Sequence, residues 1–134
     1  MTQLIIHTNE IGGVSLTIPT GEISIEAVLA KDCPDHAIIV DRASLPNEHN
    51  DFFNAWELNA GKVTVSHTKA REITKERLRQ ERAPLFTALD VQYQRATEDG
   101  RDTTIIISEK QRLRDVTKLA DKATTLDELK ALSA

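Results

Sequence analysis

The chain has 134 residues, of which 40% are hydrophobic, 28% charged and 4% aromatic, with a formal net charge of −4. This balance is typical of a globular protein of one domain or two small lobes, and it argues against a general nucleic-acid binder, which would usually be basic. No stretch approaches the roughly 18 apolar residues that span a membrane, and the N-terminus lacks the pattern of a secretory signal. The single cysteine, Cys33, excludes an internal disulfide.

The first 66 residues are predicted to form a β-rich lobe. They contain nine acidic and three basic side chains, a balance of −6, and four of the five glycines. Alternating apolar residues predict strands over 3–8 and 13–19, joined by a hairpin at "NEIGG". A short helix is expected over 24–32 with Ser24 as its N-cap, followed by strands over 36–41 and 61–66.

Three of the five aromatic residues gather in the stretch "SLPNEHNDFFNAWELN", between the last two predicted strands. They are Phe52, Phe53 and Trp56. Their simplest role is to cover the small β-core. If they exceed what the lobe can bury, they mark an interface, so we take them as candidate partner-binding residues.

Residues 67–134 are predicted to be helical. Apolar residues recur at helical spacing over 68–99 and again over 104–119. Gly100 between these segments suits the residue that ends a helix in the left-handed conformation, so the two segments predict an antiparallel helical hairpin. Thr125 and Glu128 have the spacing of a capping box and predict a short last helix.

Pro84 interrupts the first of these helical segments, in the stretch "RAPLFTALD". Proline has no backbone N–H and clashes with the carbonyl four residues earlier, here that of Gln80. The favoured expectation is two helices, with Pro84 in the first turn of the second and the boundary at Arg82 or Ala83. A single helix kinked at Pro84 is the alternative.

Two aspartates, Asp90 and Asp115, each end an apolar helical turn. In a hairpin about Gly100, residue 90 would face residue 110 approximately, and residue 85 would face residue 115. The expected ion pairs would lock the register of the hairpin, with these partners: Arg112 or Arg114 for Asp90, and Arg79 or Arg82 for Asp115. Independent surface charges explain the pattern equally well, because such pairs contribute only about 0–1 kcal/mol.

The segment 69–82 leans basic, with six Lys or Arg against three Glu. A solvated helix face is the favoured interpretation, over a strip that contacts phosphates, because no aromatic residues are interleaved with the charges.

The sequence lacks the motifs of common catalytic and metal sites. It contains no glycine-rich nucleotide loop and no zinc-binding pattern among its four histidines. Cys33 is expected to be a small apolar residue rather than a nucleophile. We therefore predict no catalytic residue, no cofactor and no metal.

The C-terminal half resembles a family of small tailed-bacteriophage proteins, the tail assembly chaperones and tail-fibre-associated proteins. The segments that carry this resemblance are "AWE" (55–57), "KAREITKERLRQERAPLFTALDVQYQRA" (69–96) and "KQRLRDVT" (110–117). The N-terminal "IIHTNEIGGVSLTIPTGEISIEAVLAKDCP" also looks like the β-lobe of phage and prophage relatives. Val91 stands where relatives are expected to carry Trp. The resemblance implies a non-enzymatic part of phage morphogenesis.

Together these observations predict an α+β protein with a β-rich lobe (1–66) and a C-terminal helical hairpin (67–134). The resemblance implies protein–protein interaction in tail or tail-fibre assembly, in the host cytoplasm. The alternatives are a permanent virion component, such as a fibre-attachment, tail or decorating subunit, or a small regulatory binding protein. The expected partners are phage tail or tail-fibre proteins, and a homo-oligomer is left open. The candidate partner-binding residues are Phe52, Phe53, Trp56, Leu85, Phe86, Leu89, Tyr93 and Leu113. The candidate structural residues are Pro84, Asp90, Gly100, Arg114 and Asp115. Neither a membrane nor nucleic acid is expected as a partner.

Overall fold

The computed structural model describes residues 2–134 and has a mixed α+β fold. Tertiary contacts divide the chain into two compact units, one ending at Ala70 and the other comprising Arg71–Ala134. The division expected from the sequence, after residue 66, falls at the start of the long helix. The contacts instead group the first turn of that helix with the N-terminal unit.

The N-terminal unit contains a three-stranded antiparallel sheet with the order β2-β1-β3. Its strands are β1 (Gln3–Thr8), β2 (Val14–Thr17) and β3 (Ile38–Asp41). Asn9 shapes the turn between β1 and β2, because its side-chain oxygen accepts hydrogen bonds from the backbone N–H groups of Ile11 and Gly13, at 3.2 and 2.9 Å. The predicted hairpin is therefore confirmed, although β2 is shorter than expected.

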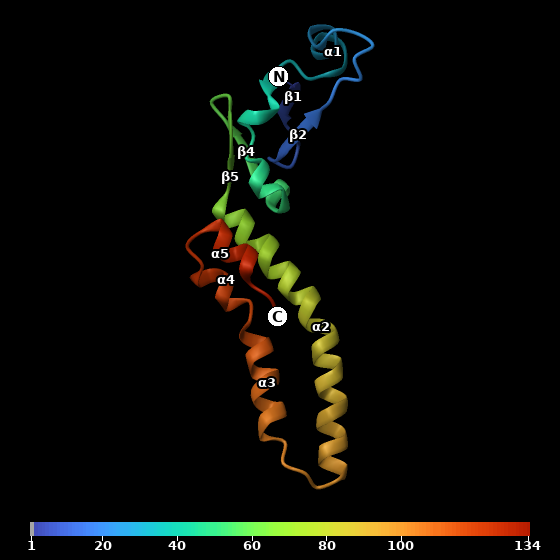
Figure 1. Cartoon of the computed structure of the whole chain (residues 1–134), viewed down its shortest axis with the longest axis vertical. Coiled ribbons are helices and arrows are strands. Elements are labelled where there is room, and N and C mark those ends of the chain that lie inside the picture. Colours follow the sequence, from blue (N-terminus) through green and yellow to red (C-terminus); the bar gives the residue numbers. More distant parts are fainter. Residues whose placement is uncertain (1) are drawn as a thin grey trace. The chain divides into compact units, whose positions relative to one another are not determined.

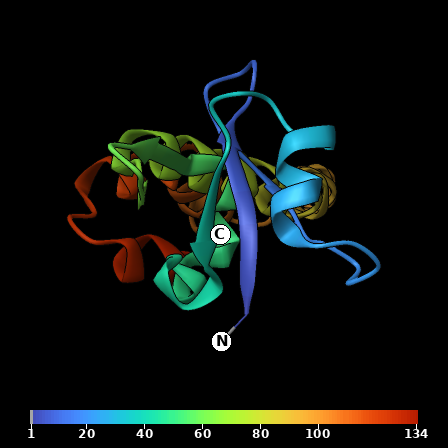
Figure 2. The same ribbon diagram turned by 90° about the horizontal axis from the view of Figure 1, so that it is seen from above.

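Both faces of β1 are covered, which explains its run of consecutive apolar residues. Leu4 and Ile6 belong to a core cluster with Trp56, whereas Ile5 packs on the opposite face with Val28 of α1 (Ile25–Asp32). Figure 2 shows α1 on one side of the blue strand β1 and the green hairpin of β4 (Trp56–Asn59) and β5 (Lys62–Val65) on the other. The predicted helix cap is also confirmed, since the Ser24 hydroxyl accepts from the Ala27 N–H at 3.2 Å.

Strand β4 was not expected from the sequence. It follows two 3₁₀ segments, η1 (Arg42–Ser44) and η2 (Asn47–Ala55), and pairs with β5. The two-residue turn between them has Ala60 at φ 52° and Gly61 at φ 78°. Positive φ at both positions is the requirement of a type I′ turn, so a tight hairpin forms here although only one of the two residues is glycine.

The C-terminal unit is helical. Its elements are α2 (His67–Glu98), which begins in the N-terminal unit, α3 (Thr104–Asp115), α4 (Lys118–Lys122) and α5 (Leu126–Ala131). Figure 1 shows α4 and α5 beside the first half of α2 and α3 beside its second half. The helix expected over 104–119 thus ends earlier, at Asp115, and the chain continues as the separate helix α4.

Two predicted helix ends are confirmed. Gly100 has φ 69°, and the N–H groups of Gly100 and Arg101 bond to the carbonyls of Thr97 and Ala96, which is the Schellman pattern. At α5 the Thr125 hydroxyl accepts from the Glu128 N–H at 3.1 Å. The hairpin of α2 and α3 is therefore closed by a glycine turn, as the sequence predicts.

Pro84 does not divide α2. The helix is continuous over its 32 residues with Pro84 inside it, so the expected boundary at Arg82 or Ala83 is wrong, and Figure 1 shows one ribbon that bends near its middle. Pro84 is exposed, so the Gln80 carbonyl that lacks its usual donor can bond to water. The Thr87 hydroxyl also donates to the Ala83 carbonyl at 3.2 Å, a contact that often accompanies a helix bend.

Candidate functional site

Asp90 forms an ion pair across the α2–α3 hairpin. The Lys110 ammonium lies 2.6 Å from the Asp90 carboxylate and 5.2 Å from the centre of the Tyr93 ring. The expectation that residue 90 faces residue 110 is correct. The predicted partners of Asp90 are wrong, because Arg112 pairs with Glu109 and Arg114 bonds to Gln111, both on their own helix.

Asp115 does not connect the two helices of the hairpin. It accepts a hydrogen bond from Gln111 and forms an ion pair with Lys118 at 3.0 Å. The Gln111 amide first, and Lys118 second, hold the pKa of Asp115 below its usual value. The expected pairs with Arg79 or Arg82 are absent from the described residues, and Arg79 pairs with Glu76 instead.

The basic face of α2 is occupied by contacts within the protein. Three arginines donate to backbone carbonyls at the ends of other helices: Arg71 to Ala123 after α4, Arg77 to Leu129 and Leu132 at the end of α5, and Arg82 to Leu113 and Arg114 at the end of α3. The last carbonyls of a helix lack partners inside the helix and carry partial negative charge, so guanidinium groups stabilise them. The interpretation of this segment as a solvated face is therefore wrong for these three side chains.

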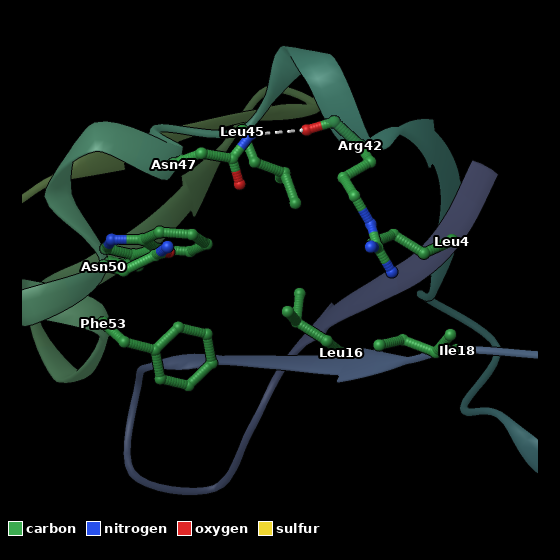
Figure 3. Close-up of a pocket in the computed structure, with 9 residues that line it drawn as sticks. Leu4, Leu16, Ile18, Arg42, Leu45, Asn47, Asn50 and Phe53 are labelled. Carbon is green, nitrogen blue, oxygen red and sulfur yellow. Dashed lines mark hydrogen bonds between the residues drawn. The ribbon is translucent and has the colours of Figure 1, made fainter. Parts of the chain in front are cut away.

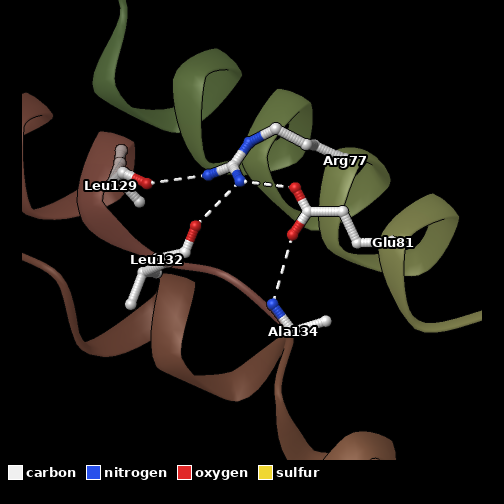
Figure 4. Close-up of polar contacts among 5 residues, drawn as sticks. All are labelled: Arg77, Glu81, Leu129, Leu132 and Ala134. Carbon is white, nitrogen blue, oxygen red and sulfur yellow. Dashed lines mark hydrogen bonds and ion pairs between the residues drawn. The ribbon is translucent and has the colours of Figure 1, made fainter. Parts of the chain in front are cut away.

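Arg77 also takes part in holding the end of the chain (Figure 4). It pairs with Glu81 at 2.9 Å, and the other oxygen of Glu81 accepts from the backbone N–H of Ala134 at 3.2 Å. The Ala134 N–H first, and the Arg77 guanidinium second, lower the pKa of Glu81. α2 thus binds the last residues of the chain through one arginine–glutamate pair.

The part of the hairpin around the Gly100 turn buries very few of its side chains. Within residues 84–112, which we call the hairpin arm, only Ala96 is buried. Several large apolar side chains are exposed there, with these exposed fractions: Ile105 80%, Ile107 49%, Val91 43%, Leu85 40% and Tyr93 38%. Two helices without a third layer cannot cover these side chains, so the arm presents an apolar surface to solvent.

The candidate residues of the hairpin differ in exposure. Leu85 and Tyr93 are exposed, Phe86 and Leu89 are half-buried, and Leu113 is 1% exposed and belongs to the interior. Leu113 is therefore wrong as a partner-contacting residue. Ile105 and Ile107 were missed, although the run "TTIII" gives the signal. Three consecutive apolar residues cannot all lie on one buried face of a helix.

Two of the grooves along the hairpin include candidate residues. One, of about 180 Å³, is lined by residues that include Leu85, Leu89 and Leu113. The other, of about 300 Å³, is lined by Tyr93, Ile107, Lys110 and Arg114. Each groove combines apolar side chains with charged residues at its margin, as helix-binding grooves do.

The aromatic cluster of the N-terminal unit lies mostly in its core. Phe52 and Trp56 are 3% and 1% exposed, and Phe53 is half-buried with its ring centre 5.0 Å from that of Trp56. The Trp56 indole N–H donates to the carbonyl of His49 at 3.3 Å. Phe52 and Trp56 are therefore wrong as an exposed binding surface, and the simpler interpretation, that they cover the β-core, is correct.

A pocket of about 220 Å³ opens beside this cluster (Figure 3). Its walls are apolar, with Leu4, Leu16, Leu45, Phe53 and Trp56 among the lining residues. The remaining lining residues are Ile18, Arg42, Asn47 and Asn50, all exposed to solvent. This pocket could not be predicted from the sequence, because its lining residues lie far apart in the chain, from Leu4 to Trp56.

The described part of the chain has no cluster of side chains typical of a metal centre. Over residues 2–134, no three His, Cys, Asp or Glu residues are grouped so that they could hold a metal ion. Cys33 is half-buried and packs against an apolar cluster. Among these residues, moreover, no helix combines the length and the apolar character that crossing a membrane requires.

Comparison with known proteins identifies no relatives: no family model, no curated protein and no solved structure matches this chain.

Proposed function

We propose that the protein acts by binding another protein through the hairpin arm, as a non-enzymatic factor in bacteriophage tail or tail-fibre assembly. The single observation that supports binding is the exposed apolar surface of the arm. Five large apolar side chains are at least 38% exposed on the hairpin arm, residues 84–112, in which only Ala96 is buried. Several large apolar side chains exposed on one element are typical of a protein–protein interaction site.

The form of the arm favours a helical partner. The two grooves described above are each lined by side chains of both α2 and α3, and a third helix laid along either groove would add a layer to the hairpin. The charged residues at the margins, such as Lys110 and Arg114, would then fix the orientation of that helix. The phage context of the proposal rests on the resemblance of the segments 55–57, 69–96 and 110–117, and it places the protein in the host cytoplasm during assembly.

The test is co-purification from infected cells with Ile105→Ser/Ile107→Ser. Both side chains are exposed, so the double variant should fold with a stability within about 1 kcal/mol of the wild type. We expect it to lose the phage tail or tail-fibre protein that the wild type retains. The matched control is Ile11→Ser/Ile23→Ser, which changes two exposed isoleucines of the N-terminal unit, 88% and 47% exposed, and should retain the partner.

Equal recovery of the partner with both double variants would contradict the role of the arm. Mass spectrometry of purified virions then separates a transient escort, which is absent, from a permanent virion component, which is present in a fixed ratio to the tail proteins.

A further inference from the structure

We propose that the pocket beside Phe53, which we call the N-terminal pocket, binds the carboxyl end of a polypeptide chain whose last residue is apolar. The residues that form it come from β1, from β2 and the residue that follows it, and from the stretch from Arg42 to Trp56, all within the N-terminal unit. The site is distinct from the hairpin arm, and the proposal does not depend on the function proposed above.

The size of the pocket limits its ligand. Pockets that hold drug-sized ligands or cofactors occupy about 300–1,000 Å³. The N-terminal pocket, at about 220 Å³, is smaller and suits one side chain with its backbone groups. Its inner wall is the margin of the main core cluster, because Leu4, Leu45 and Trp56 are members of that cluster. An apolar side chain that enters the pocket would therefore extend a core that already exists.

The charge at one end of the pocket selects an anion. Figure 3 shows the Arg42 side chain extending from η1 toward Leu4 and Ile18. Within residues 2–134 the Arg42 guanidinium forms no ion pair and no hydrogen bond. The neighbouring carboxylate, Asp41, is engaged elsewhere, since it accepts from the Ala43 N–H at 3.0 Å as the cap of η1. A planar guanidinium that is free of internal partners is well suited to bind a carboxylate with two hydrogen bonds.

The opposite end of the pocket offers an amide. Asn50 lies there, next to Phe53, and its side chain has no hydrogen-bond partner within the described part of the chain. Its amide can both donate to and accept from a peptide group. A terminal residue has these features in the same order: a carboxylate, an apolar side chain and the peptide bond that precedes it. A simple aliphatic acid lacks the last of them, which is why we infer a chain end rather than a free acid.

The test is a titration followed by ¹⁵N NMR at physiological ionic strength, where charges farther away than about 8 Å are screened. The probes are N-acetyl-leucine, its uncharged analogue N-acetyl-leucinamide, and 4-methylpentanoic acid, which has no peptide group. We expect N-acetyl-leucine to shift the amide signals of Leu16, Leu45 and Asn50 in a saturable way. The other two probes should bind at least about tenfold more weakly than N-acetyl-leucine, because each lacks one of the two polar contacts.

Three variants complete the test. Arg42→Gln should make the acid and the amide bind equally weakly, whereas Lys62→Gln, which removes one exposed positive charge from the same unit, should leave the preference for the acid unchanged. Ile18→Trp should block the pocket from its rim, because Ile18 is 58% exposed.

Three results would overturn the proposal: no saturable shift with N-acetyl-leucine, equal affinity of the wild type for acid and amide, or equal affinity for N-acetyl-leucine and 4-methylpentanoic acid. The last would identify a free acid, not a chain end, as the ligand. These comparisons use the wild-type protein, so they decide the proposal even if a variant fails to fold.

Discussion

The substitution Arg82→Gln tests whether the basic face of α2 stabilises the protein. The Arg82 guanidinium donates to the carbonyls of Leu113 and Arg114 at the end of α3, at 3.1 and 3.3 Å, and lies 5.7 Å from the centre of the Phe86 ring. In Arg82→Gln these contacts are lost, while the helix propensity of the position hardly changes. The substitution therefore reports on the contacts alone.

The expected cost follows from the kind of contact that is lost. A hydrogen bond contributes about 0.5–1.5 kcal/mol net, and a positive charge at a helix C-terminus about 0.3–1 kcal/mol. The Leu113 carbonyl keeps a second donor, the Val116 N–H at 3.4 Å, and Arg114 is exposed, so its carbonyl can bond to water; we therefore expect a total cost of about 1–2 kcal/mol. With an m-value of about 2 kcal/mol per molar urea, the unfolding midpoint should fall by about 0.5–1 M.

The assay is urea unfolding followed by circular dichroism, with Arg79→Gln as the matched control. Arg79 is on the same helix, its side chain is 46% exposed, and it pairs only with Glu76, three residues away, at 3.4 Å. Such an exposed pair contributes less than about 0.5 kcal/mol. Equal midpoints for the two variants would refute the reasoning and restore the interpretation of this segment as a solvated face.

Three further predictions concern the backbone and the chain end. Ala60→Gly should stabilise the protein by about 1 kcal/mol in the same urea assay, because Ala60 has φ 52° in the β4–β5 turn and glycine adopts that conformation without strain; an unchanged or lower midpoint would contradict this. Pro84→Ala should supply the backbone N–H donor that the Gln80 carbonyl lacks and stabilise α2 by about 1–3 kcal/mol, whereas a loss of stability would show that the fold requires the bend. The pKa of Glu81 lies below its ordinary value of 4.5, so its contribution to stability is present above that pH and is lost as the pH falls through the lower, folded-state pKa. Urea midpoints of Glu81→Gln should therefore change less than those of the wild type between pH 5 and pH 3, and parallel curves would contradict the role of the Ala134 contact.

Local signals in the sequence located most elements correctly. Ser24, Gly100 and Thr125 mark helix ends, and the structure shows each in the predicted capping role. The alternation in β2 and the turn residues at Asn9 and Gly12 predicted the first hairpin. These signals are reliable because each depends on hydrogen bonds or dihedral angles within a few residues of the chain.

The sequence was less informative where several contacts compete. Pro84 favours a helix boundary by itself, yet α2 continues through it. Contacts fix the helix on both sides, through Arg77 and Arg82 before the proline and Asp90 after it. Proline inside a helix costs about 3 kcal/mol, and these three sets of tertiary contacts together can outweigh that cost. The sequence could not predict that balance, because the partners lie 20 to more than 50 residues away.

The sequence by itself determined the α+β class, the hairpin about Gly100 and the facing of residues 90 and 110, because all three follow from local periodicity and turn chemistry. Only the tertiary structure decided which side chains remain free to bind. In the folded protein Trp56 and Leu113 are buried and Ile105 and Ile107 are exposed. Three arginines of α2 donate hydrogen bonds to backbone carbonyls at the ends of neighbouring helices. The tertiary structure also assembled the N-terminal pocket around an unpaired Arg42. Exposure depends on what the rest of the chain covers, and that depends on packing between distant segments.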